Sequence, residues 1–150
     1  MARLVEGGAE ATVIDLADLD ANALLGRRED PAVQQALGLV ERANILVAST
    51  PVYRATYTGL LKVFFDLFPQ RALEGKVAIG IATGASSAHR VAVDEGLRPL
   101  FASVNAELTP TGIYATDAEL ASPDAHAKVL EQIDRAVAEA LDLAAKLRPS

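Results

Sequence analysis

The sequence predicts an α/β protein built on a doubly wound parallel sheet, and three observations support this fold class. Short β-type runs alternate with helical runs along the 150 residues, which is the pattern of repeated βαβ units. The runs at residues 45–49 and 77–83 are almost entirely apolar and do not alternate, as expected of strands buried on both faces. Apolar residues make up 51% of the chain, which is enough for the core of a single domain spanning residues 1–150.

Four parallel strands with helices on both faces are therefore expected. The strands lie at residues 11–16 (ATVIDL), 45–49 (ILVAS), 77–83 (VAIGIAT) and within 108–115 (LTPTGIYA). Pro110 lacks a backbone N–H, so the last strand is expected to lie at an edge or to begin irregularly.

Helices are predicted from the helical spacing of apolar residues between these strands. The first begins at Asp30-Pro31, with proline in its first turn. The others span residues 58–68, 88–104 with an interruption at Pro99, and 123–147. The helix at 58–68 carries more apolar residues than one face needs, which favours a homodimer or homotetramer.

Composition and charge exclude several classes of protein. The absence of cysteine excludes a disulfide scaffold and a thiolate nucleophile. A net charge of −6 with scattered basic residues argues against nucleic acid as a partner. No apolar run approaches the roughly 18 residues of a membrane span, and the N-terminal residues do not resemble a signal peptide. A cytoplasmic protein with no membrane partner is expected.

The first candidate ligand loop follows the strand at 45–49, because open α/β sheets bind ligands beyond the carboxyl ends of their strands. This loop contains Pro51, Tyr53 and Tyr57. Two tyrosines can stack on a planar ring, and free N–H groups at Val52, Tyr53 and the following turn can bond ring carbonyls. An ordinary βα loop whose tyrosines pack on neighbouring helices explains the same composition equally well.

The second candidate loop, TGASSAH at residues 83–89, has small residues that let backbone N–H groups approach a ligand. Ser86 or Ser87 can cap the next helix, and on this segment alone a simple helix cap is the more common explanation. His89 and His126 are the only histidines and are far apart, so no metal site is expected. Neither a P-loop nor a Gly-x-Gly-x-x-Gly fingerprint is present.

Three segments in a fixed order carry a family resemblance: TPVYxxxYxGxLK from Thr50, ATGxxxxH from Ala82 and AVDxxLxP from Ala92. Together they resemble the NADPH-dependent FMN reductase family, and in particular the reductase component of two-component alkanesulfonate monooxygenase systems. The resemblance implies a flavodoxin-like sheet of order 2-1-3-4-5, FMN bound at the strand ends, and hydride transfer from NAD(P)H to flavin N5. It also implies a homo-oligomer and a flavin-dependent monooxygenase as a partner.

The resemblance assigns cofactor-binding positions but no catalytic side chain and no metal ligand, because the flavin carries the chemistry. The positions carried over are Pro51, Val52, Tyr53, Thr83, Gly84, Ala85 and His89. Lys62 and Asp66 also match the family, but their spacing of four on a helix fits packing or a subunit contact as well.

The sequence departs from the family pattern at three places. Ala85 replaces a usual second glycine, and Glu95 stands where the sulfonate-system reductases insert an aromatic residue linked to a π-bulge. The family's first strand and its Ser-rich phosphate loop have no counterpart, because residues 1–6 already read as the end of a helix that Gly7-Gly8 closes.

Loss of that strand would leave a slot about 10 Å wide between its two neighbours. We therefore expect this chain, made alone, to be poorly stable and to retain little FMN. A non-catalytic flavodoxin-like subunit, and a quinone or azo reductase using the same flavin, remain as alternatives.

Overall fold

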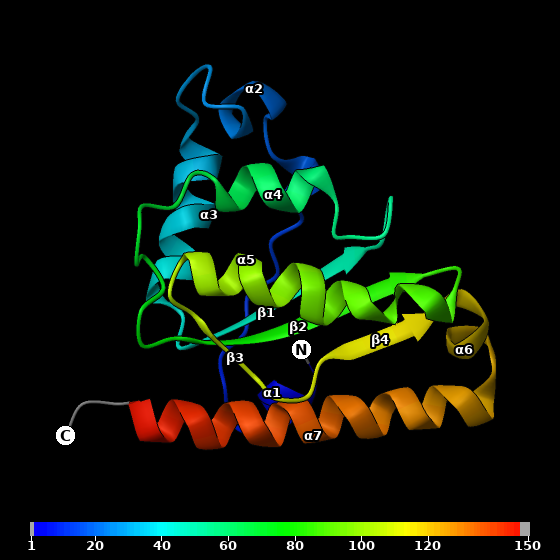
Figure 1. The fold of residues 1–150 in the computed structure, drawn as a ribbon. Helices are drawn as coiled ribbons and strands as arrows, with labels where there is room; N and C mark the ends of the chain where they lie inside the picture. The colour runs from blue at the N-terminus through cyan, green and yellow to red at the C-terminus, as the bar shows by residue number, and fades with distance from the viewer. Residues whose placement is uncertain (1, 148–150) are drawn as a thin grey trace.

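The computed structural model describes residues 2–147 and contains one parallel sheet with helices on both faces (Figure 1). Strand β1 spans Ile45–Pro51 and β2 spans Val77–Gly84, and the two run parallel in register over their whole length. Strands β3 (Glu107–Leu108) and β4 (Ile113–Thr116) pair in succession with the other edge of β2, also in parallel. The predicted parallel α/β fold is confirmed.

β3 and β4 are two pieces of the single strand predicted within residues 108–115. Between them, the Thr109 N–H still donates to the Ala78 carbonyl oxygen over 2.9 Å, and pairing resumes at Ile113 opposite Ile81. Pro110 lies in this break, where it withdraws no donor from the ladder. The expected irregularity is therefore an interruption in mid-strand.

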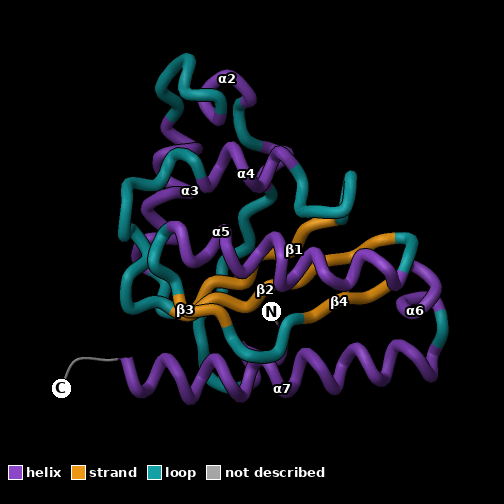
Figure 2. The backbone as a smooth tube through the Cα atoms, in the orientation of Figure 1, coloured by secondary structure: helices purple, strands orange, loops and turns teal. Residues whose placement is uncertain are grey.

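The apolar run of β2 reflects burial on both faces of the sheet. Val77 and Ile79 belong to the core cluster with the long C-terminal helix, whereas Ala78 and Ala82 belong to the cluster on the opposite face. Figure 2 shows the long helix α7 beneath the strands and helices α3, α4 and α5 above them. Successive side chains of a strand point to opposite faces of the sheet. Both the odd-numbered and the even-numbered residues of β2 must therefore be apolar.

The helices vary in length and type, and none among residues 2–147 is both long and apolar enough to cross a membrane. The α-helices are α1 (Ala2–Glu6), α2 (Ala21–Leu24), α3 (Pro31–Arg42), α4 (Gly59–Phe65), α5 (Arg98–Ser103), α6 (Asp117–Ala121) and α7 (Pro123–Leu147). Short 3-10 turns cover Leu16–Asp18 and Ser87–Val91, and a π-helical turn covers Val93–Leu97.

Side-chain caps explain where two of the predicted helices begin. The Asp30 carboxylate accepts the Ala32 N–H at 2.9 Å, and proline occupies the first turn of α3 as predicted. The Thr58 hydroxyl accepts the Leu61 N–H at 3.3 Å and starts α4. The prediction for 58–68 was three residues too long at its end, because α4 stops at Phe65 and a turn follows.

The segment predicted as one helix at 88–104 changes type twice. A 3-10 turn passes into the π-helical turn at Val93–Leu97 and then into α5. Pro99 does not interrupt the segment, because the helical backbone continues through it from the π-helical turn into α5.

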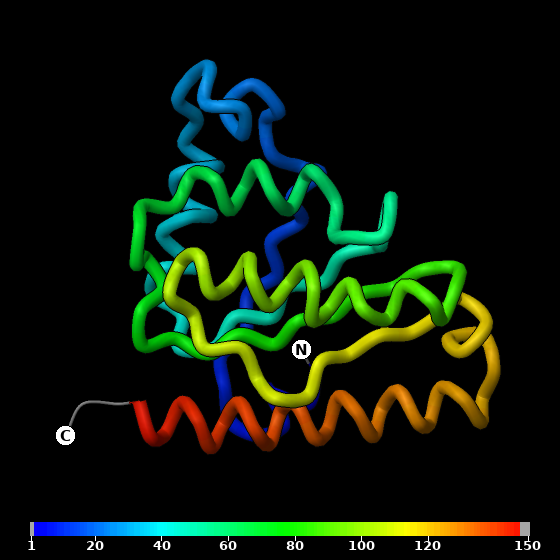
Figure 3. The backbone as a smooth tube through the Cα atoms, viewed as in Figure 1, coloured from blue at the N-terminus to red at the C-terminus, as the bar shows by residue number. Residues whose placement is uncertain are grey.

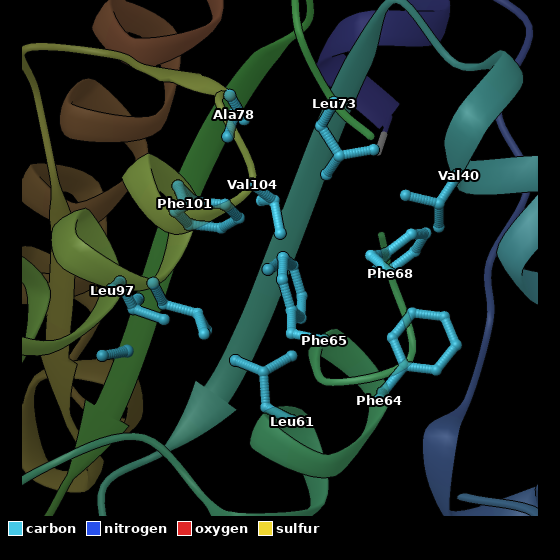
Figure 4. Close-up of a cluster of buried hydrophobic side chains, with 14 of the residues drawn as sticks. Val40, Leu61, Phe64, Phe65, Phe68, Leu73, Ala78, Leu97, Phe101 and Val104 are labelled. Atoms are coloured by element: carbon cyan, nitrogen blue, oxygen red, sulfur yellow. The ribbon is translucent and has the colours of Figure 1, made fainter. Parts of the chain in front are cut away.

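The larger core cluster is built around aromatic side chains of α4 and the turn after it (Figure 4). The ring centroid of Phe65 lies 5.7 Å from that of Phe68 and 5.5 Å from that of Phe101, in edge-to-face arrangements. Such pairs contribute about 0.5–1.5 kcal/mol each beyond their buried area. The Phe65–Phe101 pair joins α4 to α5 over the sheet.

The strand predicted at residues 11–16 is not formed. The segment runs as an unpaired coil from the turn after α1, and its end is a 3-10 turn in which the Asp15 carboxylate accepts the Ala17 N–H at 2.9 Å. Figure 3 traces it in blue behind the sheet. Val13 is 76% exposed. A strand needs a hydrogen-bonded neighbour, and no described strand pairs with these residues.

One edge of β1 is also unpaired in the described part of the chain. Among residues 2–147, β2 is its sole strand partner, and Ile45, Leu46 and Val47 are half-buried although their β2 partners Val77, Ala78 and Ile79 are buried. The segment at 11–16 has not moved in to pair with this edge. The sheet is therefore unpaired at the position where the sequence suggested a missing strand.

Candidate functional site

The two candidate loops lie side by side at the carboxyl end of the sheet. Pro51 pairs with Thr83 at the end of the β1–β2 ladder, and the Val52 N–H then donates to the Thr83 carbonyl oxygen over 2.7 Å. In Figure 1 the loops extend from the arrowheads of β1 and β2. The structure thus brings together Pro51, Val52, Tyr53, Thr83 and Gly84, as the sequence predicts.

The first loop is a tight hairpin. The Tyr53 N–H donates to the Thr56 carbonyl oxygen over 3.0 Å, and Arg54 and Ala55 form the turn between them with φ values of 54° and 68°. These are left-handed conformations at both central positions, as in the two-residue turns that favour asparagine and glycine. Non-glycine residues hold such angles at a cost of about 1–3 kcal/mol each.

Thr50, which the sequence analysis did not single out as a site residue, fixes the base of this hairpin. It is 2% exposed, and its hydroxyl accepts the Thr58 N–H at 3.1 Å and donates to the Pro51 carbonyl oxygen over 3.0 Å. One side chain therefore ties both ends of the loop together. The sequence signal that could have identified Thr50 is its position directly before the Pro51–Tyr53 segment.

The expectation of free N–H groups at Val52 and Tyr53 was wrong. Val52 donates to Thr83 and Tyr53 donates to Thr56, so both amides are used to build the loop. Instead, the amides without a protein acceptor in the described part of this loop are those of Arg54, Ala55 and Tyr57.

The two loop tyrosines differ in availability. Tyr53 is 67% exposed, so its ring is free to cover a planar ligand. Tyr57 is half-buried, and a Cβ at Gly96 in the π-helical turn would lie 3.2 Å from its Cδ1 atom. Tyr57 therefore packs as in the ordinary-loop alternative, whereas the exposed ring of Tyr53 is the one available for stacking.

The second loop presents backbone donors. The Ser86 hydroxyl accepts the Ala88 N–H at 3.2 Å and caps the 3-10 turn, as predicted. The amides of Ala85, Ser86 and Ser87 have no protein acceptor among residues 2–147, and all three residues are exposed. His89 is half-buried at the end of this loop.

Tyr114 on β4 underlies the second loop and was missed, because a tyrosine in a predicted strand reads as a core residue. Its hydroxyl donates to the Ser86 carbonyl oxygen over 2.6 Å, and burial raises the pKa of the Tyr114 phenol. A Cβ at Gly84 would lie 2.8 Å from the Tyr114 hydroxyl. Gly84 is therefore required by Tyr114, whatever its role toward a ligand.

Two other family-matched positions lie outside the loops. Lys62 and Asp66 form an ion pair with each other on the exposed side of α4, and hydrogen bonding to Asp66 raises the pKa of Lys62. Glu95 is exposed in the π-helical turn. The π-helical geometry is thus present here with a carboxylate in place of an aromatic residue.

Hollows of about 290 and 280 Å³ lie away from these loops, where the segment after α2 meets α3 and α4. Of the two arginines that line the first hollow, Arg28 is paired with Asp20 at 2.8 Å, and the Ala23 N–H together with this contact lowers the pKa of Asp20. We therefore place the ligand site at the two loops, where unpartnered amides and an exposed aromatic ring converge.

A parallel α/β sheet with loops of this kind at the ends of adjacent strands defines a protein of the flavodoxin-like class. An exposed ring, small residues and outward amides also suit the ring system of a flavin. The profile of the family described as NADPH-dependent FMN reductase matches residues 1–121. The chain belongs to this family.

Relatives and a solved structure support the assignment. The chain is 43% identical over 119 residues to an FMN reductase (NADPH) of Pseudomonas putida KT2440, covering 79% of this chain and 60% of the relative. It is 47% identical over 98 residues to the NADH-dependent FMN reductase SfnE of Pseudomonas putida, covering 65% and 53%. An apo NADH:FMN oxidoreductase (EMOB) superposes with a TM-score of 0.82 at 33% identity, covering 91% of this chain and 75% of that chain. The chain thus spans between half and two thirds of the length of these curated relatives.

Proposed function

We propose that the protein reduces FMN with a nicotinamide nucleotide. The observation that carries the proposal is the pair of adjacent loops at the ends of β1 and β2, in a chain of the NADPH-dependent FMN reductase family. When bound, FMN would supply the redox chemistry by accepting a hydride at N5. The protein's part is then to hold the ring and leave one face accessible.

The residues of the two loops divide this work. The Tyr53 ring would cover the isoalloxazine, and the Pro51–Val52 turn would set its distance from the sheet. The amides of Ala85, Ser86 and Ser87 would donate to the oxygen atoms of the pyrimidine ring. Gly84 and His89 would flank that edge.

The openness of the site supports a role in delivering reduced flavin to a partner monooxygenase. Tyr53 and Ala85, one on each loop, are both exposed. An open site fits a flavin that leaves after reduction better than one that is permanently held. Relatives named for NADPH and for NADH both match this chain, so both nucleotides belong in the assay.

Steady-state kinetics test the proposal. We expect oxidation of NADH or NADPH by the purified protein to depend on added FMN and to saturate with FMN concentration. Quinones added in place of FMN would identify a quinone reductase. Bound FMN without any nicotinamide oxidation would contradict the proposal.

The open edge of β1 is the observation that favours the alternative of a non-catalytic flavodoxin-like subunit. A sheet unpaired next to the ligand loops can assemble with a partner without holding flavin. Titration with FMN separates the two functions, since the alternative predicts no change in flavin fluorescence at any protein concentration.

A further inference from the structure

The hydroxyl of Tyr114 contacts a backbone oxygen of the second loop. Tyr114 is 1% exposed, and its hydroxyl donates to the Ser86 carbonyl oxygen over 2.6 Å. A buried phenol normally finds a hydrogen-bond partner, and here that partner belongs to a ligand loop. The His89 N–H donates to the same oxygen over 3.1 Å, so two donors hold the Ser86 carbonyl.

The direction of that carbonyl determines where the neighbouring amide points. In a trans peptide the C=O and N–H groups point in opposite directions, and the described chain has no cis peptide. Because the Ser86 carbonyl points toward buried Tyr114, the Ser87 N–H points away from the sheet. This N–H is one of the three amides that have no protein acceptor in the described chain.

Further contacts hold Tyr114 itself in place. The Arg90 guanidinium carbon lies 5.4 Å from the ring centroid, and Arg90 donates to the Tyr114 carbonyl oxygen over 3.4 Å and to Glu119 over 3.5 Å. Near the hydroxyl, Gly84 leaves a space that a Cβ would fill. The Tyr114 side chain is therefore held between the Arg90 guanidinium, which packs on its ring, and the second loop, which its hydroxyl contacts.

We propose that Tyr114 is a positioning residue of the flavin site: its hydroxyl orients residues 84–87 so that their free amides face the pyrimidine edge of the flavin. The inference rests on the proposed function. Tyr114 itself does not touch the flavin and acts through the Ser86 peptide. Without the hydroxyl, the Ser86 carbonyl loses one of its two donors and the loop adopts other orientations.

Tyr114→Phe tests this role by removing one oxygen atom. We expect the Kd for FMN, from quenching of flavin fluorescence, to rise about three- to tenfold, the equivalent of one hydrogen bond. Thr109→Val is the matched control, since the Thr109 hydroxyl is also buried and donates to a backbone oxygen, that of Thr111, over 3.1 Å. It should lose stability without changing the Kd. An unchanged Kd in Tyr114→Phe overturns the inference while leaving the proposed function intact.

A cycle without ligand tests the contact independently. Gly84→Ala should lower the melting temperature, because the new methyl group meets the Tyr114 hydroxyl. Adding Tyr114→Phe should recover part of that loss. In a separate measurement, saturating FMN should slow hydrogen exchange of the Ser87 amide less in Tyr114→Phe than in the wild-type protein.

These experiments distinguish failure of the proposed function from failure of the positioning role of Tyr114. If wild-type protein shows no FMN binding, the proposed function fails, and the cycle alone decides whether Tyr114 positions the loop. If Gly84→Ala is no better tolerated beside phenylalanine, the positioning role is overturned.

Discussion

Single residues decide whether the candidate loops are rigid enough to hold a planar ligand. Thr50 ties the two ends of the first loop through its buried hydroxyl, and Tyr114 holds the second loop from below. Between these anchors, Arg54 and Ala55 accept left-handed backbone angles. Backbone outliers of this kind persist where the surroundings over-determine them, and they cluster at functional sites.

Tyr53 is the residue whose replacement should affect ligand binding most selectively. Tyr53→Ala removes a ring that is 67% exposed, so the free energy of unfolding should change by about 0.5 kcal/mol or less. The Kd for FMN should rise about fivefold, the equivalent of about 1 kcal/mol of aromatic contact. Fluorescence titration measures the Kd, and Tyr53→Phe is the control because it keeps the ring. Equal Kd values for all three proteins would show that the ring lies elsewhere.

The sequence predicts that the two candidate loops are adjacent better than it predicts their hydrogen bonding. The rule that ligands bind beyond the carboxyl ends of parallel strands placed Pro51–Tyr53 and Thr83–Gly84 together correctly. It could not show that the Val52 and Tyr53 amides are already used, because their acceptors depend on which backbone segments come together. Tyr114 was missed for the same reason, since its hydroxyl partner lies 28 residues away.

Among the elements, those stabilised by local contacts were predicted best. α3 and α7 formed where the sequence placed them, because a cap or the helical spacing of apolar residues defines each within its own segment. The strand at residues 11–16 failed, since a strand depends on partners that local pattern does not reveal. The change of helix type within 87–103 likewise reflects packing, with Gly96 lying close against Thr56 and Tyr57.

The cap of α6 should make its stability depend on pH. Glu119 accepts the Thr116 N–H at 2.7 Å and the Thr116 hydroxyl at 3.0 Å, and these bonds lower the pKa of Glu119. A carboxylate with a lowered folded-state pKa stabilises the fold above its unfolded pKa of about 4.3. That contribution is lost as the pH falls through the lower, folded-state pKa.

Glu119→Gln isolates this contribution, because glutamine keeps an acceptor oxygen but does not titrate. The melting temperature of the wild-type protein should exceed that of the variant near neutral pH. The difference should shrink as the pH is lowered below the usual glutamate pKa of about 4.3. A difference that stays constant with pH would show that the charge of Glu119 contributes nothing to the cap.

α4 is the element through which we propose that copies of the chain associate. Leu60 is 39% exposed on this helix, and Val63 and Leu67 are half-buried beside it. Leu60→Glu should convert a dimer or tetramer to a monomer, as measured by light scattering at micromolar concentration. Leu120→Glu is the control, since Leu120 is 41% exposed on α6. A wild-type monomer, or equal masses for both variants, would contradict this interface.

At the scale of the whole molecule, the described residues include the two loops proposed to hold a flavin ring and no counterpart of the family's Ser-rich phosphate loop. FMN and riboflavin should therefore bind this chain with similar Kd values, and both weakly. Charge-assisted hydrogen bonds contribute about 1.5–3 kcal/mol each, so a phosphate site would favour FMN by orders of magnitude. Parallel fluorescence titrations with the two flavins measure the ratio. Strong preference for FMN would place a phosphate site among residues that the two loops do not include.

The unpaired edge of β1 has a consequence for the described part of the chain in concentrated solution. Its sequence, ILVASTP, carries no charged side chain and has proline only at its last position, whereas natural edge strands are commonly protected by lysine, by proline or by a bulge. The backbone groups along this edge thus form a template for any extended peptide. The resulting hazard is aggregation, in which the β1 edge of one molecule pairs with an extended segment of the next. Such growth stops only when the last strand added leaves no unpaired edge.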